Sequence, residues 1–276
     1  MAFAMPKSSR LVPVLPALLA AAALHAQDRT LPPVTVSAAR SPPAVEKSYP
    51  RMVRAMDLFE RERALRAPQA VLRFELLPRQ PGVNVDDVDL NIVSAGTVIP
   101  VPVAPDRSFT LPRDPRALRE NAVVTPDRAV RSMTWRAQVR TPGLPANTRR
   151  LGDLRLECRV GMEAGLISEK PTWAGRLGAL LTDTPAYCDS EDNRYMFFAD
   201  RPIFGVTLVA GERREALPVR RLWAGALGDE RLREWLPHCD CAMLLDRTYY
   251  APLGDARWPD ETRVVFDFMQ GAAHAP

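Results

Sequence analysis

Histidine and the familiar catalytic motifs are scarce in this chain. It has 276 residues, of which three are His, and only His238 and His274 lie beyond residue 26. A Ser-His-Asp or Cys-His site would have to use His238, because His274 lies in the C-terminal tail. No Ser stands in a G-x-S-x-G context, and H-E-x-x-H, Walker and G-x-G-x-x-G motifs are absent. These absences argue against the hydrolases, zinc proteases and nucleotide-binding enzymes that such motifs mark.

Lysine is also scarce, and the net charge is low. The only lysines are Lys7, Lys47 and Lys170, and the formal net charge is +4. The arginines are scattered among acids, as in residues 60–63 and 212–215, which is typical of a solvated surface. We therefore expect no nucleic-acid partner.

Long hydrophobic runs are absent after the first 26 residues. No later stretch approaches the ~20 apolar residues that a membrane-spanning helix needs. At the start, the basic residues Lys7 and Arg10 precede an apolar run over residues 11–24. Ala26 then supplies a small residue for cleavage before Gln27. This order of charge, apolar run and small residue is typical of a secretory signal peptide, so we expect export to the periplasm.

Proline, in contrast, is abundant, at 27 residues or about twice the average usage. Proline fixes φ and removes a backbone donor, which favours short strands with many connections over long helices. The predicted organisation is a signal peptide (1–26), a proline-rich arm (27–48), an N-terminal β-rich domain (49–165), a linking helix (166–185), a C-terminal β-rich domain (186–269) and a tail (270–276).

Alternating apolar and polar residues predict antiparallel strands with one buried face. The predicted strands cover residues 71–76, 89–93, 98–103, 108–111, 133–139, 154–160, 195–198, 204–209, 215–219 and 263–268. Met52, Met56 and Phe59 share one face at helical spacing and predict a helix over 49–65; further helices are expected over 166–181 and 229–236. The predicted fold class is mainly β, with α+β as the alternative, built from antiparallel sandwich-like sheets and a few short helices.

The two β-rich sections resemble each other and indicate a duplication. Residues 114–124 and 255–265 share Asp, Arg, Glu and Val-Val at a constant offset of 141. Upstream, residues 91–93 before Gly96 resemble residues 207–209 before Gly211. A short meander buries one face poorly by itself and gains by packing on a sister sheet. Chance similarity in a chain rich in Arg and Val is the alternative explanation.

Four cysteines in an exported chain predict disulfides, and three pairings are possible. We favour Cys158–Cys188, with Cys158 expected at the end of a strand and Cys188 in a turn. Cys239 and Cys241 would then bridge each other in a strained ring. The competing arrangement joins Cys158 and Cys188 separately to the turn at 239–241.

His238, Cys239 and Cys241 also form the one cluster with soft-metal chemistry, which suits copper or zinc. The thiols are expected to be oxidised, so we predict no metal and no other cofactor. Two acidic clusters, 86–89 and 189–192, lack the full spacing of a calcium loop and are predicted to be polar turns.

Residues 31–40, with Leu31, Pro32, Val34 and Val36, resemble the TonB box at the mature N-terminus of TonB-dependent receptors. The resemblance implies partner binding by strand addition, although 250 residues without alternating lipid-facing strands cannot form the large barrel of that family. Residues 101–112 resemble transthyretin-like and carboxypeptidase-regulatory β-sandwich modules. As a whole, the chain is similar to uncharacterised exported proteins of Gram-negative bacteria, which implies no activity.

These observations predict a non-enzymatic periplasmic protein that acts as a binding or assembly module. Its partner is expected to be another envelope protein, engaged by the N-terminal arm or by a sheet edge. One alternative is an envelope hydrolase or metal-binding protein that uses residues 238–241. Another is an accessory to TonB-dependent transport that uses residues 31–40.

Overall fold

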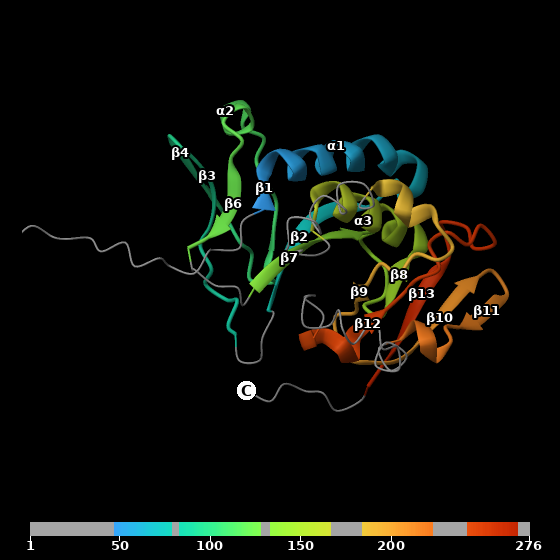
Figure 1. The fold of residues 1–276 in the computed structure, drawn as a ribbon. Helices are drawn as coiled ribbons and strands as arrows, with labels where there is room; N and C mark the ends of the chain where they lie inside the picture. Colours follow the sequence, from blue (N-terminus) through green and yellow to red (C-terminus); the bar gives the residue numbers. More distant parts are fainter. Residues whose placement is uncertain (1–46, 79–82, 128–132, 167–183, 223–241, 270–276) are drawn as a thin grey trace, which may run out of the picture. The chain divides into compact units, whose positions relative to one another are not determined.

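Antiparallel sheets and two long helices make up the structure, a computed structural model that describes residues 47–78, 83–127, 133–166, 184–222 and 242–269 (Figure 1). The strands are β1 (Lys47–Ser48), β2 (Val71–Pro78), β3 (Leu90–Ser94), β4 (Thr97–Val101), β5 (Ser108–Phe109), β6 (Val123–Pro126), β7 (Met133–Arg140), β8 (Thr148–Arg150), β9 (Phe197–Phe198), β10 (Ile203–Ala210), β11 (Arg213–Ala216), β12 (Thr248–Tyr249) and β13 (Arg263–Phe268). The helices are α1 (Tyr49–Arg66), α2 (Pro115–Arg119) and α3 (Leu151–Ala164), with short 3-10 turns η1 (Pro185–Asp189), η2 (Val219–Arg221) and η4 (Ala242–Arg247).

The strands form four sheets, and their pairings are antiparallel. The two larger sheets have the orders β1-β6-β3-β4 and β8-β13-β10-β11, called here the first and the second sheet. A three-stranded sheet has the order β5-β2-β7, and β9 pairs with β12. This confirms the predicted fold class of mainly antiparallel, sandwich-like sheets with few helices. No helix among the described residues has the length and apolar character needed to cross a bilayer.

Helix α1 begins and ends close to the predicted residues 49 and 65. The Ser48 side chain accepts a hydrogen bond from the Arg51 N–H, which satisfies one of the unpaired donors of the first turn. Pro50 occupies the first turn, where its missing N–H costs nothing. Met52 and Phe59 lie on the buried face, as predicted, while Met56 is only partly buried.

The same connectivity occurs twice in the chain. In each copy a short strand leads into a long helix, a hairpin follows, and a returning strand inserts between the hairpin and the short strand. In each copy, the first residue of the long helix donates a backbone hydrogen bond to the residue just before the returning strand. Tyr49 N–H donates to Ala122 O at 3.0 Å, and Leu151 N–H donates to Thr262 O at 2.9 Å. The two larger sheets are therefore equivalent elements of a repeated unit.

Aromatic pairs repeat as well. Phe74 lies opposite Phe109 across β2 and β5, and Phe197 lies opposite Tyr249 across β9 and β12. Both pairs stack with ring centroids 5.6 Å apart and planes 29° apart. The sequence alignment of the copies is wrong by one residue in the returning strand. Ile92 of β3 pairs with Val124, and the equivalent Leu208 of β10 pairs with Val264, not with Val265 as the alignment required.

Residues 154–160 form part of helix α3, so the predicted strand there is wrong. The described residues form two hydrophobic cores, and α3 contributes to both. Leu156, Val160 and Ala164 enter the core of the first copy. Leu151, Leu154, Cys158 and Met162 enter the core of the second. A helix buried on two sides carries apolar residues at alternate positions, which imitates the period of a strand.

The other sequence predictions divide into confirmed and untested ones. The hairpin of β10 and β11 around Gly211 is confirmed, as are the strands within 71–76, 89–93, 98–103, 108–111, 133–139, 195–198 and 263–268, with shifted ends. Most of the predicted linking helix and all of the helix over 229–236 lie outside the described residues. Propensity alone did not predict the short strands β1, β6, β8 and β12, because two to four residues carry no clear period.

Candidate functional site

Strand β4 forms an edge of the first sheet. It pairs with β3 through the two-residue turn Ala95–Gly96, and no described strand pairs with its other side. Ile99 and Val101 contact the core of the first copy. Val98 points to the opposite side and is 67% exposed. The edge therefore offers unpaired backbone groups next to an apolar side chain.

A groove of about 960 Å³ lies at the base of the β3–β4 hairpin. It is lined by residues 85–91, 100–105 and 107. Val85 and Val88 are buried, whereas Asp86 and Asp89 are exposed. Arg107 donates to Asp86 at 2.9 Å. Apolar residues, carboxylates and one arginine thus line the groove together.

The equivalent edge of the second sheet has different chemistry. Val98 pairs with Val93 in the first sheet, and Arg214 pairs with Val209 at the same place in the second. Every residue of strand β11 is exposed, and the strand carries Arg213, Arg214 and Glu215. Charged residues on an edge strand oppose pairing with other chains. Only the first of the two equivalent edges is therefore apolar.

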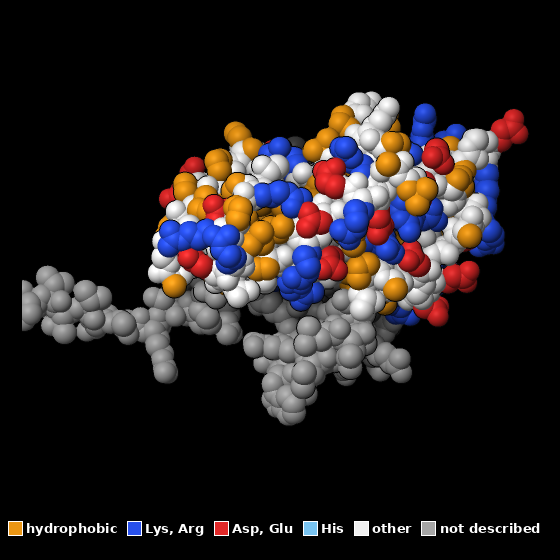
Figure 2. Space-filling model, turned by 90° about the horizontal axis from the view of Figure 1, so that it is seen from above, with side chains coloured by type: hydrophobic (Ala, Val, Ile, Leu, Met, Phe, Trp, Pro, Cys, Tyr) orange, Lys and Arg blue, Asp and Glu red, His pale blue; other side chains and the backbone are white. Residues whose placement is uncertain are grey.

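On the surface seen from above, charges of both signs are mixed (Figure 2). Hydrophobic side chains gather most densely toward the end of the molecule that contains the first sheet. The mixed charges match the expectation of a solvated Arg-rich surface, and the apolar edge strand β4 belongs to the sheet at the more hydrophobic end.

A polar layer connects β7 to the second copy. One face of β7 is apolar and belongs to the first core, while Arg136 and Arg140 occupy the other face. Arg136 donates to Met196 O at 2.7 Å and lies 4.5 Å from the ring centre of Phe198. Arg140 forms a two-bond ion pair with Asp200. These contacts fix the segment around β9 against β7.

Glu75 lies in this layer, on β2. It accepts a hydrogen bond from Gln138 Nε2 at 2.7 Å. Burial raises the pKa of Glu75 to about 7, with Arg140 opposing the rise and Asp200 adding to it. A carboxyl group with this pKa can exchange a proton near neutral pH. Its hydrogen-bond partner among the described residues is an amide, which gives no nucleophile for a reaction.

Helix α3 brings two more carboxylates into buried positions. Glu157 accepts from Arg149 at 2.7 Å and from the Val139 N–H at 2.8 Å. Asp153 accepts from the N–H and the hydroxyl of Thr141, both at 2.8 Å. Burial raises the pKa of Asp153. Because these carboxylates have protein partners on β7, on β8 and at Thr141 just after β7, they join the two copies and do not form a paired-carboxylate site.

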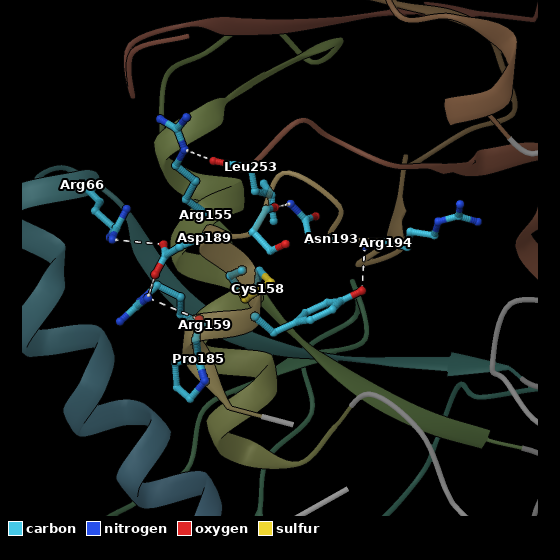
Figure 3. Close-up of a disulfide and its surroundings, with 12 residues drawn as sticks. Arg66, Arg155, Cys158, Arg159, Pro185, Asp189, Asn193, Arg194 and Leu253 are labelled. Atoms are coloured by element: carbon cyan, nitrogen blue, oxygen red, sulfur yellow. Dashed lines mark hydrogen bonds and ion pairs between the residues drawn. A yellow bond between two sulfur atoms is a disulfide. The ribbon is translucent and has the colours of Figure 1, made fainter. Parts of the chain in front are cut away.

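The disulfide Cys158–Cys188 joins α3 to η1, with Cα atoms 6.0 Å apart (Figure 3). This confirms the favoured pairing and excludes the one in which both cysteines reach residues 239–241. Cys158 lies inside a helix, not at the end of a strand as expected. Arg159, on the same helix, donates to Glu62 of α1 at 2.6 Å and to Asp189 of η1 at 2.7 Å. The bridge therefore lies within a set of ion pairs that connects three elements.

The other predicted site residues have separate outcomes. His238, Cys239 and Cys241 lie outside the described residues, as do Leu31, Pro32, Val34 and Val36. The acidic clusters at 86–89 and 189–192 are in turns, where Asp86 and Asp189 pair with arginines. Among the described residues, no three His, Cys, Asp or Glu side chains gather as metal ligands.

Sequence reasoning missed Glu75, Asp153 and Glu157. The signal for Glu75 was present, because it stands within the alternating strand 71–76 at a position whose neighbours are apolar. The chain matches no protein-family model, no curated protein and no solved structure. Its resemblances to the TonB box and to β-sandwich modules therefore remain predictions.

Proposed function

We propose that this protein is a non-enzymatic binding module of the bacterial cell envelope that holds an extended segment of a protein partner along β4. One observation carries the proposal: two equivalent sheet edges occur in the chain, and only the edge at β4 is apolar and lies beside a large groove. Natural proteins protect exposed edge strands with charge. An edge left without charge, in a chain that protects its duplicate, is suited to binding.

Strand addition explains how β4 would bind. The unpaired backbone groups of β4 would hydrogen-bond to the partner, and alternate side chains would give selectivity. Pro100 has no N–H, so the ladder of bonds would be limited to the part of β4 near Val98. Asp86 is already paired with Arg107, so the carboxylate of Asp89 would favour a basic residue of the segment at the groove.

The compartment is part of the proposal. The predicted signal peptide indicates export, and disulfides persist in the periplasm rather than in the cytosol. The bridge Cys158–Cys188 supports this location. An envelope protein is accordingly the proposed partner.

A peptide-display selection tests the binding site. Decapeptides selected on the chain from Gln27 onward are expected to alternate apolar residues and to carry a basic residue near one end. Val98→Arg, which introduces the residue of β11, should weaken their binding by at least about tenfold, because a charge opposes edge pairing. Val219→Arg is the matched control, since Val219 is 64% exposed in the second copy. Equal binding by both variants would contradict the proposed site.

A further inference from the structure

The outer face of the second sheet carries arginines in one row across its strands. Arg214 on β11 pairs with Val209 on β10, Val209 pairs with Arg263 on β13, and Arg263 pairs with Arg150 on β8. The residues next to them in sequence, such as Leu208 and Val264, point into the core. With about 4.8 Å between strands, the row spans about 14 Å.

The first sheet has no such row at the equivalent positions. There Val98 pairs with Val93, Val93 pairs with Val123, and Val123 pairs with Ser48. Each arginine of the second sheet thus stands where the first sheet has an uncharged residue. The fold therefore does not require arginine at these positions.

Folding stability does not explain the row either. Arg263 and Arg150 are directly opposite each other, and like charges in that arrangement destabilise a sheet. Arg214 and Arg263 are exposed and form no ion pair with a described residue. Arg150 is largely buried and reaches the exposed Glu261 at 3.4 Å. On the same face, the next acid along β13 is Asp267, about 13 Å from Arg263 along the strand.

Exposed aromatic chemistry lies in the same sheet. Phe204, on β10, is 74% exposed. Aromatic side chains together with cations are typical of surfaces that bind the interface of a membrane.

We propose that the outer face of the second sheet, at Arg214 and Arg263, binds the phosphate groups of anionic lipids at a membrane surface. The arginines project from one side of a sheet, so their guanidinium groups can meet phosphates that also lie in one plane. Guanidinium groups bind phosphate oxygens through paired hydrogen bonds. This second surface is separate from the peptide edge at β4, so the protein would hold its partner close to a membrane.

Vesicle binding tests the proposal. The chain from Gln27 onward is used, because the apolar run at 11–24 would itself bind lipid and the unit 40–276 is retained. Vesicles of phosphatidylcholine with about 30 mol% phosphatidylglycerol are compared with vesicles of phosphatidylcholine alone by flotation at low salt. We expect binding to the anionic vesicles only, weakening with salt as surface charges are screened.

The variant Arg214→Val/Arg263→Val introduces the residues of the first sheet. It should reduce the partition coefficient about 25-fold, about fivefold for each arginine near an anionic surface. The control Arg61→Ala/Arg119→Ala removes two exposed arginines from the first copy and should bind as the unchanged chain does. Circular dichroism melts check that both variants fold.

Three outcomes would overturn the proposal. They are equal binding to both kinds of vesicle, equal losses in both double variants, and binding of poly-glutamate instead of vesicles in an Arg214-dependent manner. The last result would assign the row to an acidic protein. Peptide binding at β4 is expected to survive Arg214→Val/Arg263→Val, so failure of one proposal is distinguishable from failure of the other.

Discussion

Removal of the Cys158–Cys188 bridge tests how strongly α3 depends on η1. The cleanest perturbation keeps both cysteines and removes the other two: the variant Cys239→Ala/Cys241→Ala has Cys158–Cys188 as its disulfide. Adding a reductant to this variant then breaks one bond without creating a cavity. Comparison of the oxidised and reduced forms isolates the effect of the bridge.

The expected magnitude follows from the closed loop. The bridge spans a sequence separation of 30 residues. The chain-entropy relation gives a loss of about 3.5 kcal/mol for a loop of this length. In a chain of this size, 1 kcal/mol corresponds to about 2–4 °C in Tm, so reduction should lower Tm by about 10 °C. The ion pairs of Arg159 with Glu62 and Asp189 remain and keep the elements in contact.

Thermal melts followed by circular dichroism measure this difference, with thiol labelling and mass spectrometry to establish full reduction. A fall of less than about 3 °C in the fully reduced variant would refute the reasoning. It would mean that the bridge adds little to the ion pairs and to the packing of α3 in both cores.

Three more perturbations test the buried contacts. Glu157→Gln leaves the Arg149 guanidinium buried without its counter-charge and should lower the free energy of unfolding by about 3 kcal/mol in urea titrations; an unchanged urea midpoint would contradict this. Glu75 keeps its proton in the folded state up to pH about 7 but loses it near 4.5 when unfolded, so stability should fall as pH rises between these values, by at most about 3 kcal/mol. Glu75→Gln should remove this slope, and parallel pH profiles of the two proteins would count against it. Phe74→Ala and Phe197→Ala should each cost about 3–5 kcal/mol, because the two rings are equivalent; a large loss at one site and none at the other would argue against equivalent copies.

Local patterns in the sequence predicted the elements whose periods are unambiguous. Helix α1 has a capping serine, Pro50 in its first turn and one buried face, and its period indicates a helix. The hairpin β10–β11 has alternating residues on both sides of Gly211, which adopts φ +60° as a turn of this type requires. In these elements, local preference and tertiary burial agree.

Helix α3 shows why the remainder was not predictable. Its period of two arises from burial on both sides, and the second core comes from residues after 184. A local window contains no information on that distant core. The duplication was visible in the sequence, but its exact alignment was not. The comparison of residue types aligned the returning strands one residue away from the alignment that the strand pairing gives.

The candidate edge was equally hidden. The sequence predicts a strand within 98–103, but only the order of the sheet identifies β4 as an edge. Its contrast with β11 also requires the pairing of Val98 with Val93 and of Arg214 with Val209. The pairing Cys158–Cys188, in contrast, was favoured on the expectation of export and of a turn at Cys188, although the strand expected to carry Cys158 is helix α3.

Hydrogen–deuterium exchange with a selected peptide tests the central claim most directly. Residues 97, 99 and 101 direct their N–H groups toward β3, and Pro100 has none, so strand addition places a new hydrogen bond on the N–H of Val98. The Val98 amide should therefore exchange more slowly in the complex. The equivalent amide of β11, that of Arg214, should be unaffected and serves as an internal control. Protection of β4 without protection of β11 is the predicted result. Protection of β11 alone, or of neither strand with peptide bound, would contradict the account.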